Sequence, residues 1–137
     1  MKLIIVDPEE KYPSGFTPKN IVDGEIDLSD ISDNECEEIL IRNAFTQVPI
    51  DNCVQILVQL SSKLRRGGII RFNGVDSRTV ARKLISGIID DKEYNNLVYS
   101  CKSMLSIPLV KEVVHASGLK IETLKLEGFN YDVTATR

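Results

Sequence analysis

The stretch Ser62-Lys63-Leu64-Arg65-Arg66-Gly67-Gly68-Ile69-Ile70-Arg71-Phe72 decides the fold of this chain. Before it, apolar residues recur at helical spacing from Cys53 to Leu64, which predicts a helix that begins near Pro49 and ends at the glycine pair. After the glycine pair, the apolar run from Ile69 to Phe72 predicts a strand that is buried on both faces. A helix that leads directly into a buried strand is typical of α/β proteins with parallel sheets.

Short apolar runs elsewhere predict the neighbouring strands. Leu3 to Val6 and Ile39 to Ile41 have the same continuous apolar character, so we expect them to be the other central strands. Between them, the segment from Glu9 to Ser32 is interrupted by prolines and glycines, and only Ile21 to Val22 suggests a further short strand.

The second half of the chain predicts two more helices and a terminal hairpin. One helix begins near Asp76 and carries a broad apolar stripe as far as Ile89, and the other runs from Ser106 to Ser117, with a polar loop between them. Alternating stretches at Leu119 to Leu126 and Tyr131 to Thr136 then form the hairpin. We therefore predict an α/β fold: a three-layer Rossmann-like sandwich whose mostly parallel sheet ends in a C-terminal antiparallel hairpin.

Composition limits the classes of protein to consider. The 137 residues, 42% of them hydrophobic, suit a single domain spanning residues 1–137. With 17 basic and 20 acidic residues the net charge is -3, which disfavours general nucleic-acid binding. The three cysteines are widely spaced and favour reduced thiols over disulfides or zinc, and the apolar runs are too short for a signal peptide or a membrane span. We expect a cytoplasmic protein without a metal site.

Several segments of the chain resemble one enzyme family. The quoted stretch from Ser62 to Phe72 is similar to the "RVLKPGG" helix-to-strand junction of compact class I S-adenosylmethionine-dependent methyltransferases, the methyltransferase-11-like group. Other pieces match that group's "MKLNLGCG", "PGF", "NVD" and "DL" elements in order: Met1-Lys2-Leu3, Pro13-Ser14-Gly15-Phe16, Asn20-Ile21-Val22-Asp23 and Asp27-Leu28. The resemblance covers nearly the whole chain and implies the same fold.

The chain departs from the family where the cofactor would bind. In the family the first strand ends in a glycine-rich turn that lets the backbone approach the cofactor, whereas this chain has Val6-Asp7-Pro8 and no glycine. The family's "SHVLEHI" segment is replaced by Arg42-Asn43-Ala44-Phe45-Thr46-Gln47-Val48, which lacks both histidines and the glutamate. The sequence therefore gives no catalytic residue to name.

The resemblance still implies positions for cofactor contacts. Asp23 matches the acidic residue that would bind the ribose, and Asp27 with Leu28 would border the adenine. Asp7, at the end of the first strand, and Asn43 complete the set of cofactor-binding candidates. Asp23-Gly24 is also a common turn pair, so a structural role for Asp23 stays open.

Three hypotheses about function follow. The leading one is a degenerate methyltransferase-like domain, without catalysis or a bound cofactor, that acts as a binding, scaffolding or regulatory module beside a protein partner or as a homo-oligomer. The first alternative is an active methyltransferase that binds S-adenosylmethionine through an altered loop. A remote alternative is a receiver-like signalling domain, because Lys2 to Asp7 is similar to the first strand of phosphoacceptor receivers; phosphate uptake at Asp51 would test it.

Overall fold

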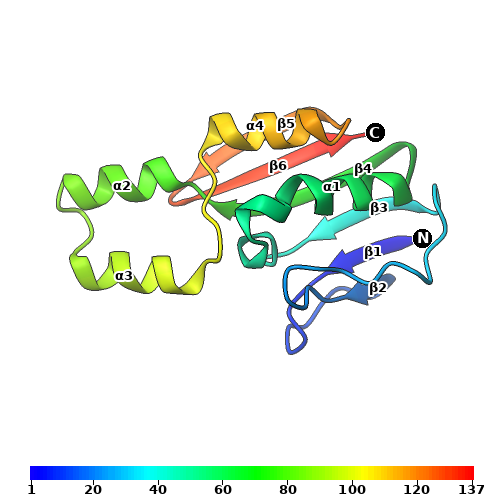
Figure 1. Ribbon diagram of the computed structural model, residues 1–137, viewed down its shortest axis with the longest axis horizontal. Helices are drawn as coiled ribbons and strands as arrows, with labels where there is room; N and C mark the ends of the chain where they lie inside the picture. The colour runs from blue at the N-terminus through cyan, green and yellow to red at the C-terminus, as the bar shows by residue number, and fades with distance from the viewer.

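The computed structural model describes residues 1–137 as one α/β unit built on a six-stranded sheet (Figure 1). The strands are β1 (Lys2–Ile5), β2 (Phe16–Lys19), β3 (Cys36–Ile41), β4 (Leu64–Val75), β5 (Lys120–Glu127) and β6 (Asn130–Thr136). The helices are α1 (Cys53–Lys63), α2 (Ser77–Ile85), α3 (Asp91–Ser100) and α4 (Ile107–Ala116), and two 3-10 turns, η1 (Phe45–Gln47) and η2 (Ile50–Asn52), precede α1.

The sheet has the order β2-β1-β3-β4-β6-β5. Its first four strands are parallel, and β6 runs antiparallel to both β4 and β5, so the C-terminal hairpin closes one side of the sheet. The predicted mixed α/β, Rossmann-like class with a mostly parallel sheet and a terminal hairpin is confirmed.

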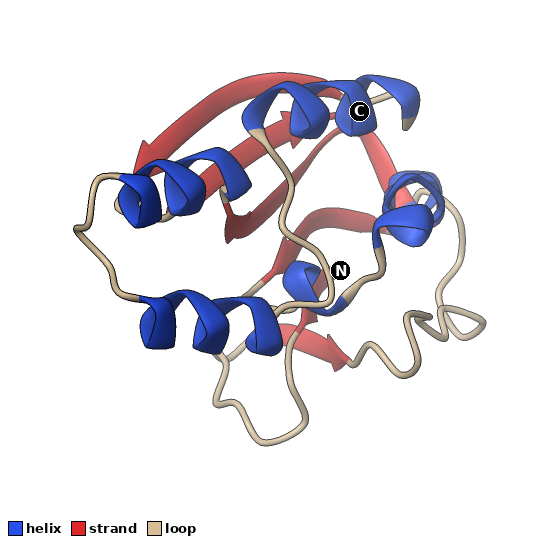
Figure 2. Cartoon of the chain, turned by 60° about the vertical axis from the view of Figure 1, so that its left-hand side comes forward, coloured by secondary structure: helices blue, strands red, loops and turns tan.

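The main core lies between one face of the sheet and the helices α1 and α4 (Figures 1 and 2). Alternate residues of the strands, such as Ile39 and Ile41 of β3 and Ile70 and Phe72 of β4, point into this core and are buried. The Phe72 ring contacts the Tyr131 ring edge-on, with the ring centroids 6.4 Å apart. Burial of this apolar surface is the main source of the fold's stability.

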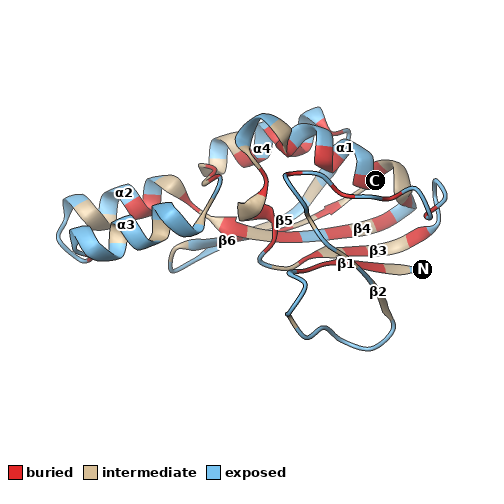
Figure 3. Ribbon diagram, turned by 60° about the horizontal axis from the view of Figure 1, so that its bottom comes forward, coloured by how far each residue is buried: buried red, intermediate tan, exposed pale blue.

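The opposite face of the sheet carries no helix, and the β1–β2 connection is an exposed loop on this side, with Pro13 lining a cavity there (Figure 3). The alternate residues on this face are largely polar: Glu38 of β3 forms ion pairs with Lys2 at 3.3 Å and with Arg71 at 3.9 Å. Ile4 is nevertheless fully buried here. Helices therefore cover only one face of the sheet, and the third layer predicted for the sandwich is not built from helices.

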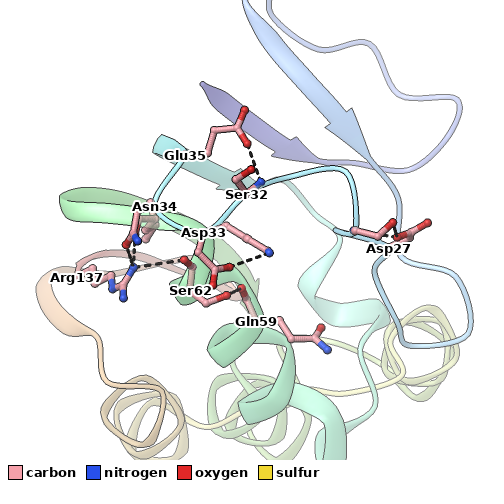
Figure 4. Close-up of polar contacts among 11 residues, drawn as sticks. Asp27, Ser32, Asp33, Asn34, Glu35, Gln59, Ser62 and Arg137 are labelled. Carbon is pink, nitrogen blue, oxygen red and sulfur yellow. Dashed lines mark hydrogen bonds and ion pairs between the residues drawn. The ribbon is translucent and has the colours of Figure 1, made fainter.

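A polar network lies at the amino ends of β3 and β4, where the C-terminal residue Arg137 meets the segment that leads into β3 (Figure 4). The Arg137 guanidinium donates hydrogen bonds to Asn34 Oδ1 at 2.6 Å and to the Ser62 carbonyl at 3.3 Å. Lys63 forms an ion pair with Asp33 at 2.9 Å. The contacts of Arg137 join residues that are more than 70 positions apart in the sequence.

The glycine pair does not end the helix, contrary to the sequence prediction. Helix α1 already ends at Lys63, and β4 begins at Leu64, whose side chain is fully buried. The glycines lie inside β4, where the pairing with β3 shifts register and Gly67 adopts a φ of 76°. The prediction was wrong because a bulge within a strand and a helix end both favour glycine.

Three other elements differ from the predictions. The strand expected at Ile21–Val22 is an isolated bridge between Val22 and Glu25, and the strand itself, β2, lies at Phe16–Lys19. The second predicted helix, α2, ends at Ile85, so its apolar stripe does not reach Ile89. The polar loop expected between the last two helices contains helix α3, none of whose residues is buried.

Candidate functional site

Strands β1 and β3 are neighbours at the point in the sheet where the chain changes the side on which it adds strands. From β1 the chain passes to β2 on one side, and β3 pairs with β1 on the other. In open α/β sheets this switch point is where ligands bind. The residues that follow the two strands, Val6-Asp7 and Arg42-Asn43, lie at this place, and the Arg42 N–H donates a hydrogen bond to the Ile5 carbonyl at 3.0 Å.

The turn after β1 is occupied by side chains, and its backbone donors are partly used. Val6 is buried, and its N–H donates a hydrogen bond to the Lys19 carbonyl at 3.0 Å. Asp7 is exposed, its carbonyl accepts a hydrogen bond from the Glu10 N–H at 3.0 Å, and Pro8 has no N–H to offer. No helix follows this turn, because the chain runs directly to β2.

Arg42 fixes the β1–β2 connection against the end of β3. Its Nε lies 3.6 Å from the Glu10 carboxylate, and its Nη1 donates a hydrogen bond to the Lys11 carbonyl at 3.5 Å. Arg42 therefore joins residues 10 and 11 of the connection to the end of β3.

Two asparagines link the ends of β3 and β4. The Asn43 N–H donates to Asn73 Oδ1 at 2.9 Å, and Asn73 Nδ2 donates to Asn43 Oδ1 at 2.7 Å. Asn43 has a φ of 54°, a backbone conformation that asparagine adopts more readily than most residues. Sequence reasoning selected Asn43 and missed Asn73, which carries no signal beyond being a polar residue at the end of an apolar run.

The asparagine pair separates two cavities. The larger, about 450 Å³, lies on the helix-free face of the sheet, with Arg42, Arg71 and Asp132 in its lining, and the smaller, about 270 Å³, lies toward Cys101. Both guanidinium groups of the larger cavity are paired with carboxylates, Arg42 with Glu10 and Arg71 with Glu38, and Asp132 adds a third carboxylate, so the cavity has no excess of positive charge.

Asp23 and Asp27 lie together at a different place, in an open cavity of about 660 Å³ beyond β2. Asp23, with a φ of 51°, and Gly24, with a φ of 76°, are the central residues of a tight turn closed by the Val22–Glu25 bridge. Asp23 thus has a structural role in this turn. The hydroxyl and the N–H of Ser29 donate to the Asp27 carboxylate at 2.6 Å and 3.0 Å and lower the pKa of Asp27.

The remaining predicted site residues, Leu28 and Asp7, line neither the cavities beside the asparagine pair nor the cavity of Asp23 and Asp27. Leu28 is buried and lines a third cavity of about 270 Å³ beside Gln59 and Lys63, and it belongs to the main core. Asp7 lines none of the cavities described above. The structure therefore brings Asp23 and Asp27 into one cavity and places Asp7, Leu28 and Asn43 outside it.

Cys36, Cys53 and Asp51 lie outside the cavities described above. Burial raises the pKa of the Cys36 and Cys53 thiols, and neither forms a disulfide. No three histidine, cysteine, aspartate or glutamate side chains gather in an arrangement suited to a metal ion. None of the helices has the length and hydrophobicity of a bilayer-crossing segment. Asp51, the residue of the receiver hypothesis, is exposed in the 3-10 turn η2.

Comparison with known proteins finds similarity in structure alone. No family model matches the chain, and no curated protein matches its sequence. Among solved structures, a methyltransferase from Mesorhizobium loti that depends on S-adenosylmethionine matches over 93% of this chain and 72% of its own, with a TM-score of 0.65 and 10% identity. The CurJ carbon methyltransferase matches over 90% of this chain with a TM-score of 0.60 and 18% identity.

A third similar structure is a Haloferax volcanii methyltransferase in complex with the methyltransferase activator Trm112, with a TM-score of 0.62, 8% identity and 92% of this chain covered. The match spans 63% of that chain and 35% of the CurJ enzyme, so this chain corresponds to only part of the length of several of these proteins. Identities this low establish the fold alone. The chain therefore has the fold of the class I S-adenosylmethionine-dependent methyltransferases.

Proposed function

We propose that this chain is a degenerate methyltransferase-like domain that does not use S-adenosylmethionine and acts as a binding, scaffolding or regulatory module. The observation that carries the proposal is the β1–β2 connection. It begins with Val6-Asp7-Pro8, has no glycine before Gly15, contains no helix and contacts the end of β3 through Arg42.

The Val6-Asp7-Pro8 turn restricts access to the main chain. A cofactor approaches a glycine turn closely because no Cβ intervenes, and a helix that follows the turn presents its N-terminal N–H groups. Here the Val6 N–H is already bonded to Lys19, Pro8 has no N–H, and no helix follows the turn. A ligand at this edge would meet side chains and would find few free backbone donors.

A protein partner fits the same proposal. One structural neighbour is a methyltransferase in complex with an activator protein. That association belongs to the neighbour, and it supports the expectation that a chain of this fold works beside another protein. The net charge of -3 supports a protein partner over a nucleic acid.

The alternative is an active methyltransferase with an altered cofactor loop. The observation that favours it is the shared cavity of Asp23 and Asp27, which follows the end of β2 and has the volume to admit a nucleoside. Methyl transfer depends mainly on positioning donor and acceptor, so the lack of the family's histidines does not exclude it.

Calorimetry with S-adenosylmethionine and S-adenosylhomocysteine separates the two. The degenerate domain is expected to show no heat of binding at about millimolar ligand, whereas micromolar affinity would overturn the proposal. If binding is observed, Asp23→Ala and Asp27→Ala are expected to weaken it, with Asp51→Ala, an exposed aspartate outside that cavity, as the matched control.

A further inference from the structure

Strand β5 forms a long free edge of the sheet. It is the last strand in the sheet order, and its pairing with β6 uses one side of its backbone. No other backbone hydrogen bond reaches residues 120–127, so the outer N–H and carbonyl groups are unpaired within the chain. The opposite edge, β2, is four residues long and contains Pro18, which makes it a poor template for pairing.

The side chains of β5 divide between the two faces of the sheet in an unusual way, because the strand contains a bulge. Ile121 pairs with Ala135 and Thr123 pairs with Thr134, so Glu122 is an extra residue. The Glu122 carboxylate accepts a hydrogen bond from the Thr136 hydroxyl at 3.0 Å. Glu122 therefore lies on the helix-free face together with Thr123.

The rest of the strand alternates regularly. Ile121 and Leu124 pack against the main core, and Leu126 is opposite the buried Tyr131, so these three lie on the helix-covered face. Lys125 is opposite Asp132 on the helix-free face, where Lys120 and Glu127 also lie.

This pattern is complementary to itself. When two copies of β5 run antiparallel with a two-fold axis at Leu124, the bulge of each strand faces Lys125 of the other. Each Glu122 then meets a Lys125, and each Lys120 meets a Glu127. All facing residues lie on the same side of the sheet, as strand pairing requires. Lysines on an edge strand normally discourage pairing, but in this register a glutamate balances each one.

An apolar contact supports the same register. Leu126 is 47% exposed, which is high for a leucine in a strand, and β5 is bordered by a groove of about 400 Å³ between it and α4. The groove is lined on its apolar side by Val114, Leu119 and Ile121. In the register above, Leu126 of one copy is opposite Ile121 of the other, beside this groove, and the exchange occurs twice.

We propose that two copies of this chain associate through antiparallel β5–β5 pairing, which continues the sheet across both molecules. The two-fold axis passes at Leu124, the four charged residues Lys120, Glu122, Lys125 and Glu127 form intermolecular ion pairs, and Leu126 enters the groove beside α4 of the second copy. The inference holds whether or not the domain binds S-adenosylmethionine.

The test uses charge reversal at the centre of the interface, read by analytical ultracentrifugation over about 1 μM to 1 mM protein. The unmodified chain is expected to dimerise. Lys125→Glu places two glutamates opposite each other twice per dimer, and Glu122→Lys does the same with lysines, so each variant is expected to dimerise at least about tenfold more weakly. Far-UV circular dichroism confirms that the variants, both at exposed sites, are folded.

The decisive measurement mixes the two variants. In a mixed dimer the two substituted positions face each other with opposite charges, and the unchanged Glu122 of one chain faces the unchanged Lys125 of the other. An equimolar mixture is therefore expected to restore dimers, as is the double variant E122K/K125E. Glu112→Lys, on the exposed surface of α4, is the matched control and is expected to leave dimerisation unchanged. A monomeric unmodified chain at the highest concentration, a dimer indifferent to both reversals, or a mixture that stays monomeric would overturn the proposal.

Discussion

At the scale of single residues, the contact between Gly74 and Tyr131 shows how closely the carboxyl end of β4 packs against β6. The two residues pair across β4 and β6, and a Cβ atom built at Gly74 would overlap the phenol ring. The backbone of Gly74 is not in the left-handed region, so the glycine is required by this ring and not by a turn. A glycine inside a strand often marks such a close approach.

Gly74→Ala is expected to lower the free energy of unfolding by about 1 to 3 kcal/mol, because the buried ring of Tyr131 has no room to move. Urea denaturation measures the change. In a Tyr131→Leu background the same substitution is expected to cost less, since the overlapping atoms are gone. An equal cost in both backgrounds would contradict the explanation.

The three thiols differ in accessibility. Cys36 and Cys53 are fully buried and burial raises the pKa of both thiols, whereas Cys101 is partly exposed. A reagent that reacts with thiolates, such as an aromatic disulfide, is therefore expected to modify one thiol quickly in the folded protein and all three after denaturation. Cys101→Ser is expected to remove the fast phase, and a fast phase that persists in this variant would refute the assignment.

At the scale of elements, helices α2 and α3 form an arm that projects beyond the carboxyl ends of the strands (Figure 1). Helix α3 has no buried residue and contacts mainly α2, whereas α4 buries Val110, Val113 and Val114. A side chain caps the start of α3: Asp90 accepts a hydrogen bond from the Glu93 N–H at 2.8 Å. The stability of α3 thus depends on its cap and on α2 more than on the main core.

Hydrogen exchange is expected to be much faster in α3 than in α4, because α3 can open without exposing the core. Asp90→Ala is expected to lower the local stability of α3 by up to about 2 kcal/mol and thus to speed its exchange further, while exchange in α4 stays unchanged. Mass spectrometry of exchanged peptides gives both rates. Equal protection of the two helices would show that the arm is more firmly attached than its contacts imply.

At the scale of the whole molecule, ionisation limits stability at both ends of the pH range. Hydrogen bonds from Ser29 lower the pKa of Asp27, and the bond from Lys19 lowers the pKa of Asp30. A lowered pKa in the folded state contributes stability above the unfolded value and loses it as pH falls. Burial raises the pKa of Tyr131, so its contribution is present below the unfolded value of 10.0 and is lost as pH rises.

The free energy of unfolding is therefore expected to fall below about pH 4 and again above about pH 9, with a plateau between. Urea denaturation across this range measures it. Tyr131→Phe is expected to reduce the alkaline slope, and Tyr99→Phe, which changes an exposed tyrosine, is the control that should leave the slope unchanged. An alkaline slope that is the same in both variants would exclude Tyr131 as the cause.

Most of the individual elements could be predicted from the sequence, and the candidate site only in part. Apolar periodicity is local, so it identified the three central strands, α1, α4 and the hairpin. It missed α3, although the pair Asp90 and Glu93 is a recognisable helix-start signal. Asp23 and Asp27 were selected by resemblance and lie in one cavity, whereas the contact of Asn43 with Asn73 joins two strands and has no local signal.

The sequence by itself determined the three central strands, the helices α1, α2 and α4, the terminal hairpin, the fold class and the absence of glycine from the turn after β1, because each of these depends on residues that are neighbours along the chain. Only the tertiary structure decided that β6 lies between β4 and β5, that helices cover one face of the sheet, and that β5 is left as a free edge. These features depend on pairings between distant segments, whose register is set by packing and not by local pattern.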